Sequence, residues 1–224
     1  MKYKIWLFIA ISIFVISAGF GWFKPDIIAH LLEEDIAALV ELSGFLASLP
    51  PVVIAIFIFI KNSLSLLLSF LLSPILCLVP LLALTANGWL LGWISAKVIE
   101  EESLSFLLAG LLPHGVLELP AFIIGEAAAL SFGAMAIVLV IKRESRSTLM
   151  STIKQDVRHL LLALALLFVI GPFYAIIILS LLQKQTRDLL MMNLNRNLRY
   201  LIIALALLVP AALIEAFITP LLMK

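Results

Sequence analysis

Long runs of apolar residues, separated by shorter polar segments, set the pattern along this chain. A helix needs about 20 apolar residues to cross the hydrocarbon core of a bilayer. Runs of about this length occupy residues 5–23, 52–72, 75–96, 121–141, 160–182 and 200–223. The pattern therefore predicts an all-α, polytopic membrane bundle of about six transmembrane helices.

The apolar run over residues 104–141 is longer than the others. It is too long for one ordinary crossing and too short for two crossings and a turn. Pro113 and Pro120 lie in its first half, where proline interrupts helical hydrogen bonding. We therefore expect a broken or re-entrant segment over 104–119, followed by a crossing over 121–141.

Residues 24–50 have a different pattern, in which acidic residues alternate with apolar ones. The apolar positions recur every three or four residues, which is typical of an amphipathic helix. Pro50 and Pro51 end the pattern. We expect an external amphipathic helix that lies in the membrane interface, and the alternative is a surface that docks a protein partner.

The positive-inside rule predicts how the chain is oriented. Lys2 and Lys4 place the N-terminus in the cytoplasm. The acid-rich segments 24–50 and 97–103 then lie outside, and the basic loop 142–159 lies inside. This loop is expected to be solvated near anionic headgroups, or to dock a cytoplasmic partner.

A second basic segment conflicts with this orientation. If residues 160–182 cross the membrane, the basic residues of 183–199 are placed outside. Either this segment violates the charge rule or 160–182 does not cross completely. The expectation here remains an N-in bundle of six crossings.

Composition agrees with membrane insertion and narrows the function classes. Hydrophobic residues make up 64% of the 224 residues and charged residues 13%, against roughly 45–50% and 25% in soluble domains. Mean hydropathy is +1.21. These values exclude a secreted enzyme and a nucleic-acid binder, and predict one integral domain over 1–224, embedded in a lipid bilayer. The single cysteine, Cys77, excludes a disulfide framework and a cysteine-ligated zinc site.

Polar side chains within the apolar runs are the candidate functional residues. A charge at the centre of a transmembrane helix costs roughly 2.5–3.5 kcal/mol on insertion scales, so such residues are expected to have a role. The intramembrane polar set is Lys61, Asn62, Asn87, His114, Glu118, Glu126 and Glu215.

Spacing relates some of these residues to one another. His114 and Glu118 are four residues apart, so on a helix they share one face. Glu215 can meet them only through tertiary packing. Gly88 and Gly92 are also four apart, a spacing that allows two membrane helices to approach closely.

Three interpretations of the polar set remain open. It can be a buried hydrogen-bonded network, in which Lys61 neutralises a carboxylate and the asparagines cap helix ends. It can be a permeation or proton path. It can also be a divalent metal site made by His114, Glu118 and Glu215. No other cofactor is expected, because the sequence has no zinc-protease pattern, nucleophile elbow, phosphate loop or dinucleotide fingerprint.

Several motifs resemble the stage II sporulation protein M family. Phe59-Ile60-Lys61-Asn62 and Asn87-Gly88-x3-Gly92 look like the middle of that family. The segment from Leu112 to Pro120, with its Pro-His-Gly-x2-Glu string, looks like the most distinctive stretch, and Ala211–Ile218 is similar to the terminal helix. The resemblance spans roughly residues 50–222. The chain departs from the family where Ser73-Pro74 replaces an expected glycine, and at Glu126.

The resemblance implies a multi-pass protein of a prokaryotic plasma membrane without a well-established catalytic activity. It implies a scaffold or assembly factor, with a protein partner or homo-oligomer. A transporter or channel-like protein with a His/Glu cavity is the alternative, and a metal-dependent intramembrane enzyme is the third hypothesis. The residues that match family motifs are His114, Glu118, Asn62, Asn87 and Glu215.

Overall fold

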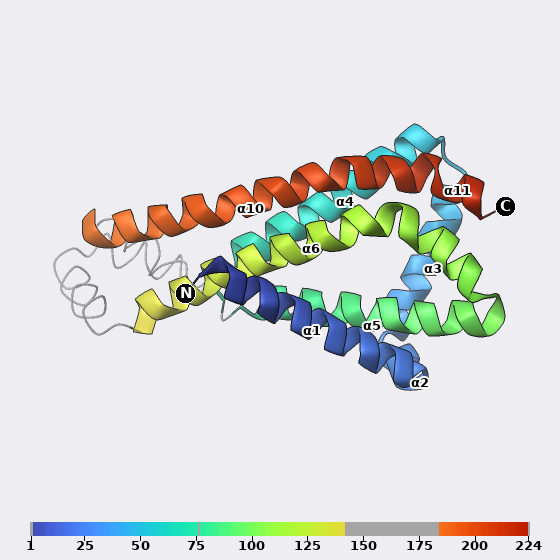
Figure 1. Ribbon diagram of the computed structural model, residues 1–224, viewed down its shortest axis with the longest axis horizontal. Coiled ribbons are helices and arrows are strands. Elements are labelled where there is room, and N and C mark those ends of the chain that lie inside the picture. Colours follow the sequence, from blue (N-terminus) through green and yellow to red (C-terminus); the bar gives the residue numbers. More distant parts are fainter. Residues whose placement is uncertain (1, 76, 142–183, 224) are drawn as a thin grey trace.

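The computed structural model describes residues 2–75, 77–141 and 184–223, and these residues form helices and no strand. The all-α prediction is therefore confirmed. The helices, labelled in Figure 1, are α1 (Tyr3–Phe23), α2 (Pro25–Leu31), α3 (Glu33–Ala47), α4 (Pro51–Leu72), α5 (Leu78–Glu101), α6 (Leu104–Ile141), α10 (Lys184–Phe217) and α11 (Thr219–Leu222).

Five of these helices are long and apolar enough to cross a membrane: α1, α4, α5, α6 and α10. Many of their large apolar side chains face outward, including Phe8 and Ile16 of α1 and Leu82 of α5. Outward apolar surface is the expected covering of a bundle whose solvent is lipid. The structure thus agrees with a polytopic membrane protein. The sixth predicted crossing, over 160–182, lies outside the described residues.

Helix α6 is the centre of the bundle, because it packs against α1, α4, α5, α10 and α11. The predicted break into a re-entrant segment and a separate crossing is not found, since one helix runs from Leu104 to Ile141. The ribbon instead changes direction part-way along (Figure 1). A proline removes one hydrogen bond and bends a helix, and the bonds around Pro113 and Pro120 are sufficient to keep α6 continuous.

Helices α1 and α5 form a close pair, because glycines lie at their contact. A Cβ atom on Gly88 would overlap Ser17 and the Phe14 carbonyl, and one on Gly92 would overlap the Ala18 carbonyl. Only a residue without a side chain allows backbones to approach this closely. The pair therefore sets one wall of the bundle.

The segment predicted as one amphipathic helix is two helices, α2 and α3, which meet at Leu32. The backbone of Leu32 is not helical. Three consecutive acidic residues, 33–35, follow it in the first turn of α3, where the helix dipole favours negative charge. The half-buried residues of α3 form one stripe, which consists of Ile36, Leu39, Leu42 and Leu46, whereas its acidic side chains are exposed.

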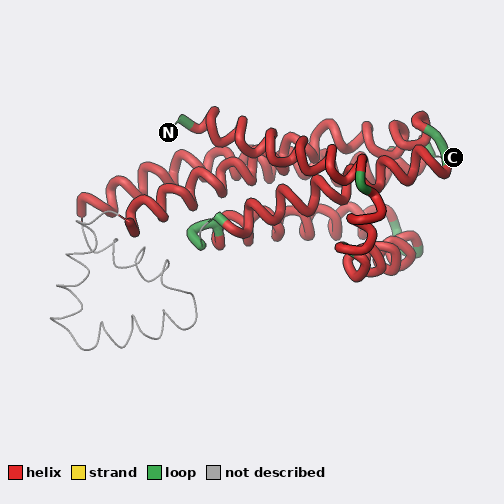
Figure 2. The backbone as a smooth tube through the Cα atoms, turned by 90° about the horizontal axis from the view of Figure 1, so that it is seen from below, coloured by secondary structure: helices red, strands yellow, loops and turns green. Residues whose placement is uncertain are grey.

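Different helices and helix ends lie at the two ends of the bundle. The N-terminus, the end of α6 and the start of α10 lie at one end, and α3, α11 and the α5–α6 turn lie at the other (Figure 1). Figure 2 shows the N and C ends of the chain toward opposite ends of the bundle. The predicted order of crossings, which placed residues 141 and 184 on opposite sides, is therefore wrong. With this arrangement Lys2, Lys4 and the basic start of α10 share one end, as the positive-inside rule favours.

Candidate functional site: a polar intramembrane cavity

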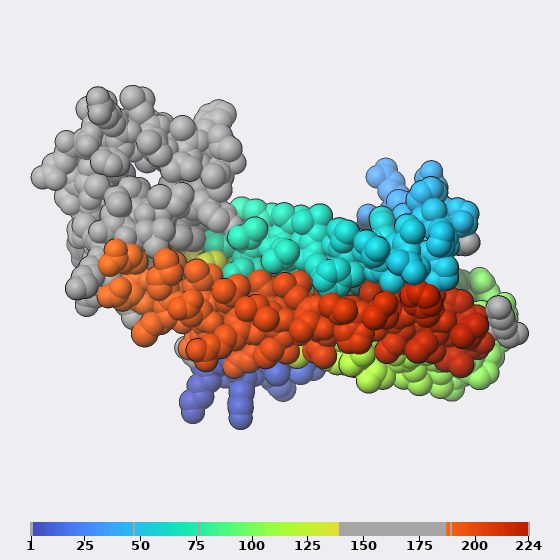
Figure 3. Space-filling view, turned by 90° about the horizontal axis from the view of Figure 1, so that it is seen from above, coloured from blue at the N-terminus to red at the C-terminus, as the bar shows by residue number. Residues whose placement is uncertain are grey.

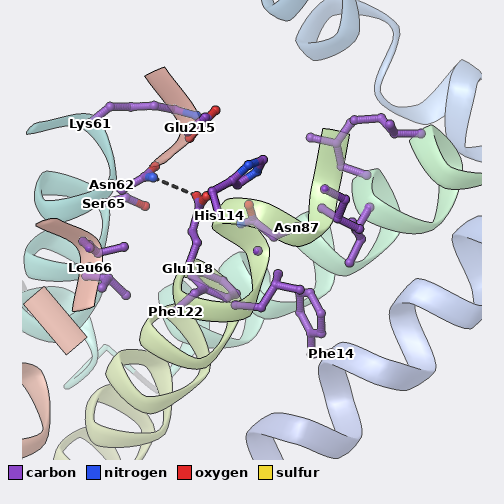
Figure 4. Close-up of a pocket in the computed structure, with 17 residues that line it drawn as sticks. Phe14, Lys61, Asn62, Ser65, Leu66, Asn87, His114, Glu118, Phe122 and Glu215 are labelled. Carbon is purple, nitrogen blue, oxygen red and sulfur yellow. Dashed lines mark hydrogen bonds and ion pairs between the residues drawn. The ribbon is translucent and has the colours of Figure 1, made fainter. Parts of the chain in front are cut away.

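A cavity of about 430 Å³ lies within the bundle, lined by residues of α1, α4, α5, α6 and α10. This volume is in the range of small-molecule sites, about 300–1,000 Å³. Its wall is apolar in large part, with Phe14, Leu66 and Phe122 among the lining residues (Figure 4). Six polar or charged residues singled out from the sequence also line it: Lys61, Asn62, Asn87, His114, Glu118 and Glu215.

Three helices supply the polar cluster. His114 and Glu118 come from successive turns of α6, next to Pro113 and before Pro120. Lys61 and Asn62 are neighbours in the middle of α4, and Glu215 lies near the end of α10. Because α6 packs against both α4 and α10, side chains that are distant in sequence meet at its bend (Figure 4).

The distances within the cluster define one common centre. One ligand atom from each of His114, Glu118 and Glu215 lies within 4.8 Å of the others. His114 Nε2 is 3.9 Å from Glu118 Oε2. Asn62 Nδ2 donates a hydrogen bond of 2.8 Å to the other oxygen, Glu118 Oε1, drawn as the dashed line in Figure 4. Glu118 is therefore held between α4 and the imidazole.

The opposite side of the His114 ring faces the C-terminal end of the chain. His114 Nδ1 lies 3.2 Å from Thr219 Oγ1, at the start of α11. Thr219 Oγ1 is also 3.4 Å from the carbonyl oxygen of Ile214 and can donate to it. Thr219 is buried, so this short chain of hydrogen bonds fixes the orientation of the imidazole.

A second hollow, of about 390 Å³, adjoins the cluster on the side of α3. It shares Lys61, Asn62, Glu118 and Glu215 with the first cavity, and it is also lined by Leu39 and Leu42 of α3. In the space-filling view α3 protrudes beside the packed α4 and α10 (Figure 3). The polar cluster thus separates two hollows, and α3 covers the outer one.

The charges of the cluster favour a small cation. Two carboxyl groups and an imidazole offer oxygen and nitrogen acceptors, against one lysine ammonium group among the cavity residues. The apolar wall lowers the local dielectric constant, which strengthens such interactions relative to water. In chemical terms the site can hold a proton, a metal ion or another small positively charged solute.

Two members of the predicted polar set lie apart from this centre. Asn87 lines the cavity, but its amide group donates to Ala83 O of its own helix. Glu126 lies in the interface of α6 with α4, where Ser69 Oγ donates to its Oε2 at 2.5 Å. Glu126 is 0% exposed and does not line the cavity.

The sequence patterns did not indicate Thr219 and Ser69, which are the partners of His114 and Glu126. Thr219 follows Glu215 by one helical turn and precedes Pro220. This spacing was a usable signal, because a threonine hydroxyl group that follows an intramembrane glutamate by four residues needs a hydrogen-bond partner inside the bundle. Ser69 had no comparable signal among the serines of α4.

Comparison with known proteins identifies the family. A family model described as "Stage II sporulation protein M" matches residues 7–178. The match includes Lys61, Asn62, His114 and Glu118, whereas Glu215 and Thr219 lie beyond it. No match was found among curated proteins or among solved structures. Because this family model matches more than half of the chain, the protein belongs to the stage II sporulation protein M family.

Proposed function

We propose that this chain is a transporter or channel-like protein that binds a small cation in its intramembrane cavity. The observation that carries the proposal is the meeting of His114, Glu118 and Glu215 on one cavity, with donor atoms within 4.8 Å. Ionisable groups are expensive in a membrane, and where they face a cavity they mark solute and proton paths.

The two adjoining hollows support the same proposal. A solute that enters beneath α3 meets Lys61, Glu118 and Glu215 first, because these residues line both hollows. Helix α3 has few contacts with the rest of the bundle. It can therefore move without disturbing the packing of α4, α6 and α10, and movement of α3 would change access to the cluster.

Flux measurements with purified protein in liposomes test the proposal. A trapped pH-sensitive dye reports the entry of protons, and quenching of trapped calcein reports the entry of Co²⁺. Both are measured with a membrane potential that is negative inside the liposomes. We expect Glu118→Gln to reduce the entry of the transported cation at least about tenfold, a barrier change of about 1.4 kcal/mol. The matched control is Glu126→Gln, which changes a glutamate of the same helix outside the cavity and is expected to leave flux unchanged.

Two results would contradict the proposal. One is wild-type protein that passes neither cation faster than protein-free vesicles. The other is a Glu118→Gln variant that folds in lower yield but has unchanged flux per folded molecule. The second result would favour a scaffold or assembly factor. That candidate is supported by α3, whose exposed acidic side chains could dock a basic partner opposite its cavity-facing stripe.

A further inference from the structure

We infer that His114, Glu118 and Glu215 form a binding site for one divalent transition-metal cation, such as Zn²⁺ or Mn²⁺. This inference builds on the proposed function, because it names the chemical class of the cation that the cavity holds. It rests on three observations: the contacts of the two imidazole nitrogens, the arrangement of the carboxylates, and the space beside them.

The hydrogen bonds around His114 leave one ring nitrogen with a free lone pair. A threonine hydroxyl has one proton to donate. Thr219 Oγ1 lies 3.4 Å from the Ile214 carbonyl oxygen, which can only accept, and we assign the hydroxyl proton to that contact; Oγ1 then accepts from His114 Nδ1 at 3.2 Å. In a neutral imidazole the other nitrogen, Nε2, then carries the lone pair. Metal-ligating histidines are oriented in the same way, by donation from the second ring nitrogen to a fixed acceptor.

The lone pair of His114 Nε2 faces carboxylate oxygens rather than a donor. It lies 3.9 Å from Glu118 Oε2, and the amide of Asn62 already occupies Glu118 Oε1. Glu215 contributes a third acceptor within 4.8 Å. Acceptors gathered in an apolar environment repel one another, and a cation between them converts this repulsion into attraction.

The donor set and its dimensions fit a transition metal. One imidazole nitrogen and two carboxylate oxygens are ligands of zinc and of related divalent ions. Bonds of about 2.0–2.2 Å place neighbouring ligands of a tetrahedral shell about 3.3–3.6 Å apart. Rotation of the two glutamate side chains, which border the cavity, can close the remaining distance. The cavity leaves room for water or solute as a fourth ligand.

Lys61 is the group that competes with a metal ion. It lines the same cavity as the three ligands, and it extends toward Glu215 in Figure 4. The Lys61 ammonium group repels a divalent cation bound to the same carboxylate. It must therefore move away from Glu215, or its repulsion weakens metal binding. Removing this charge should therefore tighten metal binding, whereas loss of folding would weaken it. This opposite sign makes Lys61→Met a sharp test.

The test is equilibrium binding of Co²⁺ to the full-length protein in detergent, followed by its visible absorption bands and by displacement with Zn²⁺. We expect one Co²⁺ per chain. His114→Gln and Glu215→Gln should each weaken binding at least about 100-fold, and Thr219→Val about 10- to 100-fold, as for other partners of metal-bound histidines. Lys61→Met should tighten binding. Glu126→Gln, the control for a distant buried glutamate, should bind as wild type does.

The inference is overturned if wild-type protein shows no saturable binding up to about 1 mM Co²⁺, an affinity too weak for a built site. It is also overturned if Co²⁺ binds with equal affinity to wild type, His114→Gln and Glu215→Gln, or if Lys61→Met weakens binding in a protein with unchanged thermal stability. These measurements need no membrane gradient. Binding without flux would therefore remove the transport proposal and keep the metal site, and flux without binding would do the reverse.

Discussion

The two halves of α6, residues 104–120 and 121–141, carry glutamates eight residues apart in very different surroundings. In the first half, Glu118 has a side chain that is 28% exposed and borders the cavity. In the second half, Glu126 is 0% exposed and has Ser69 as its partner. The residue type is the same, and the size of the neighbouring side chains differs.

Small residues explain the close packing of the second half. Ala121, Ala127, Ala128 and Ala129 are all 0% exposed, and they let α6 approach its neighbours closely. The first half is bent at its prolines and has larger side chains, so space remains beside His114 and Glu118. Packing therefore decides whether a carboxyl group of α6 borders a cavity or is enclosed between helices.

The largest expected effect is from Gly133→Ala in the closely packed half. The added methyl group would overlap the Ser73 carbonyl oxygen, which belongs to the backbone and cannot rotate away. We expect the free energy of unfolding to fall by about 3 kcal/mol, at the upper end of typical overpacking costs. Chemical denaturation in detergent measures this loss.

The matched control is Gly115→Ala in the first half of the same helix. Its methyl group would lie 3.5 Å from the side chain of Leu111, an ordinary contact. Alanine is also the better helix former by up to about 1 kcal/mol, so stability should stay the same or rise. Equal losses in the two variants would contradict the difference in packing between the halves.

A smaller effect is expected when each glutamate loses its hydrogen-bond donor. Ser69→Ala leaves Glu126 without a partner in a dry interface and should cost about 2 kcal/mol. Asn62→Ala removes the donor to Glu118, but water in the cavity can replace it, so the cost should be below about 1 kcal/mol. Thermal unfolding measures the loss of stability in each variant. A larger loss in Asn62→Ala than in Ser69→Ala would contradict the expectation and show that water does not enter the cavity.

The smallest expected effect is that of Tyr3→Phe, which acts near the beginning of the closely packed half. Tyr3 OH donates a hydrogen bond of 2.8 Å to Ile124 O of α6, and its ring stacks on Tyr200. Phenylalanine keeps the stacking and loses the hydrogen bond, so stability should fall by about 1 kcal/mol. Cation flux should not change, because Tyr3 does not line the cavity. A change in flux would show that packing in the second half of α6 affects the cavity beside the first half.

Local patterns in the sequence were sufficient to predict the helical class and the family. They were insufficient to predict where helices bend, break or end. The length of the run 104–141 suggested a break that the structure replaces with a bend. The acid-rich segment suggested one helix where the structure has α2 and α3. A single non-helical residue, Leu32, makes that difference, and neither its type nor its spacing indicates it.

The sequence by itself determined that this chain lies in a membrane, because so many apolar residues cannot be hidden from water in a soluble fold of this size. It also identified the costly polar residues, since each interrupts an apolar run. Only the tertiary structure decided which of them meet. Glu215 joins His114 and Glu118 because α10 packs against α6, whereas Glu126 is excluded because small residues fill its surroundings. Contacts between distant helices depend on the shapes of whole surfaces, and these are not encoded in the spacing of any single segment.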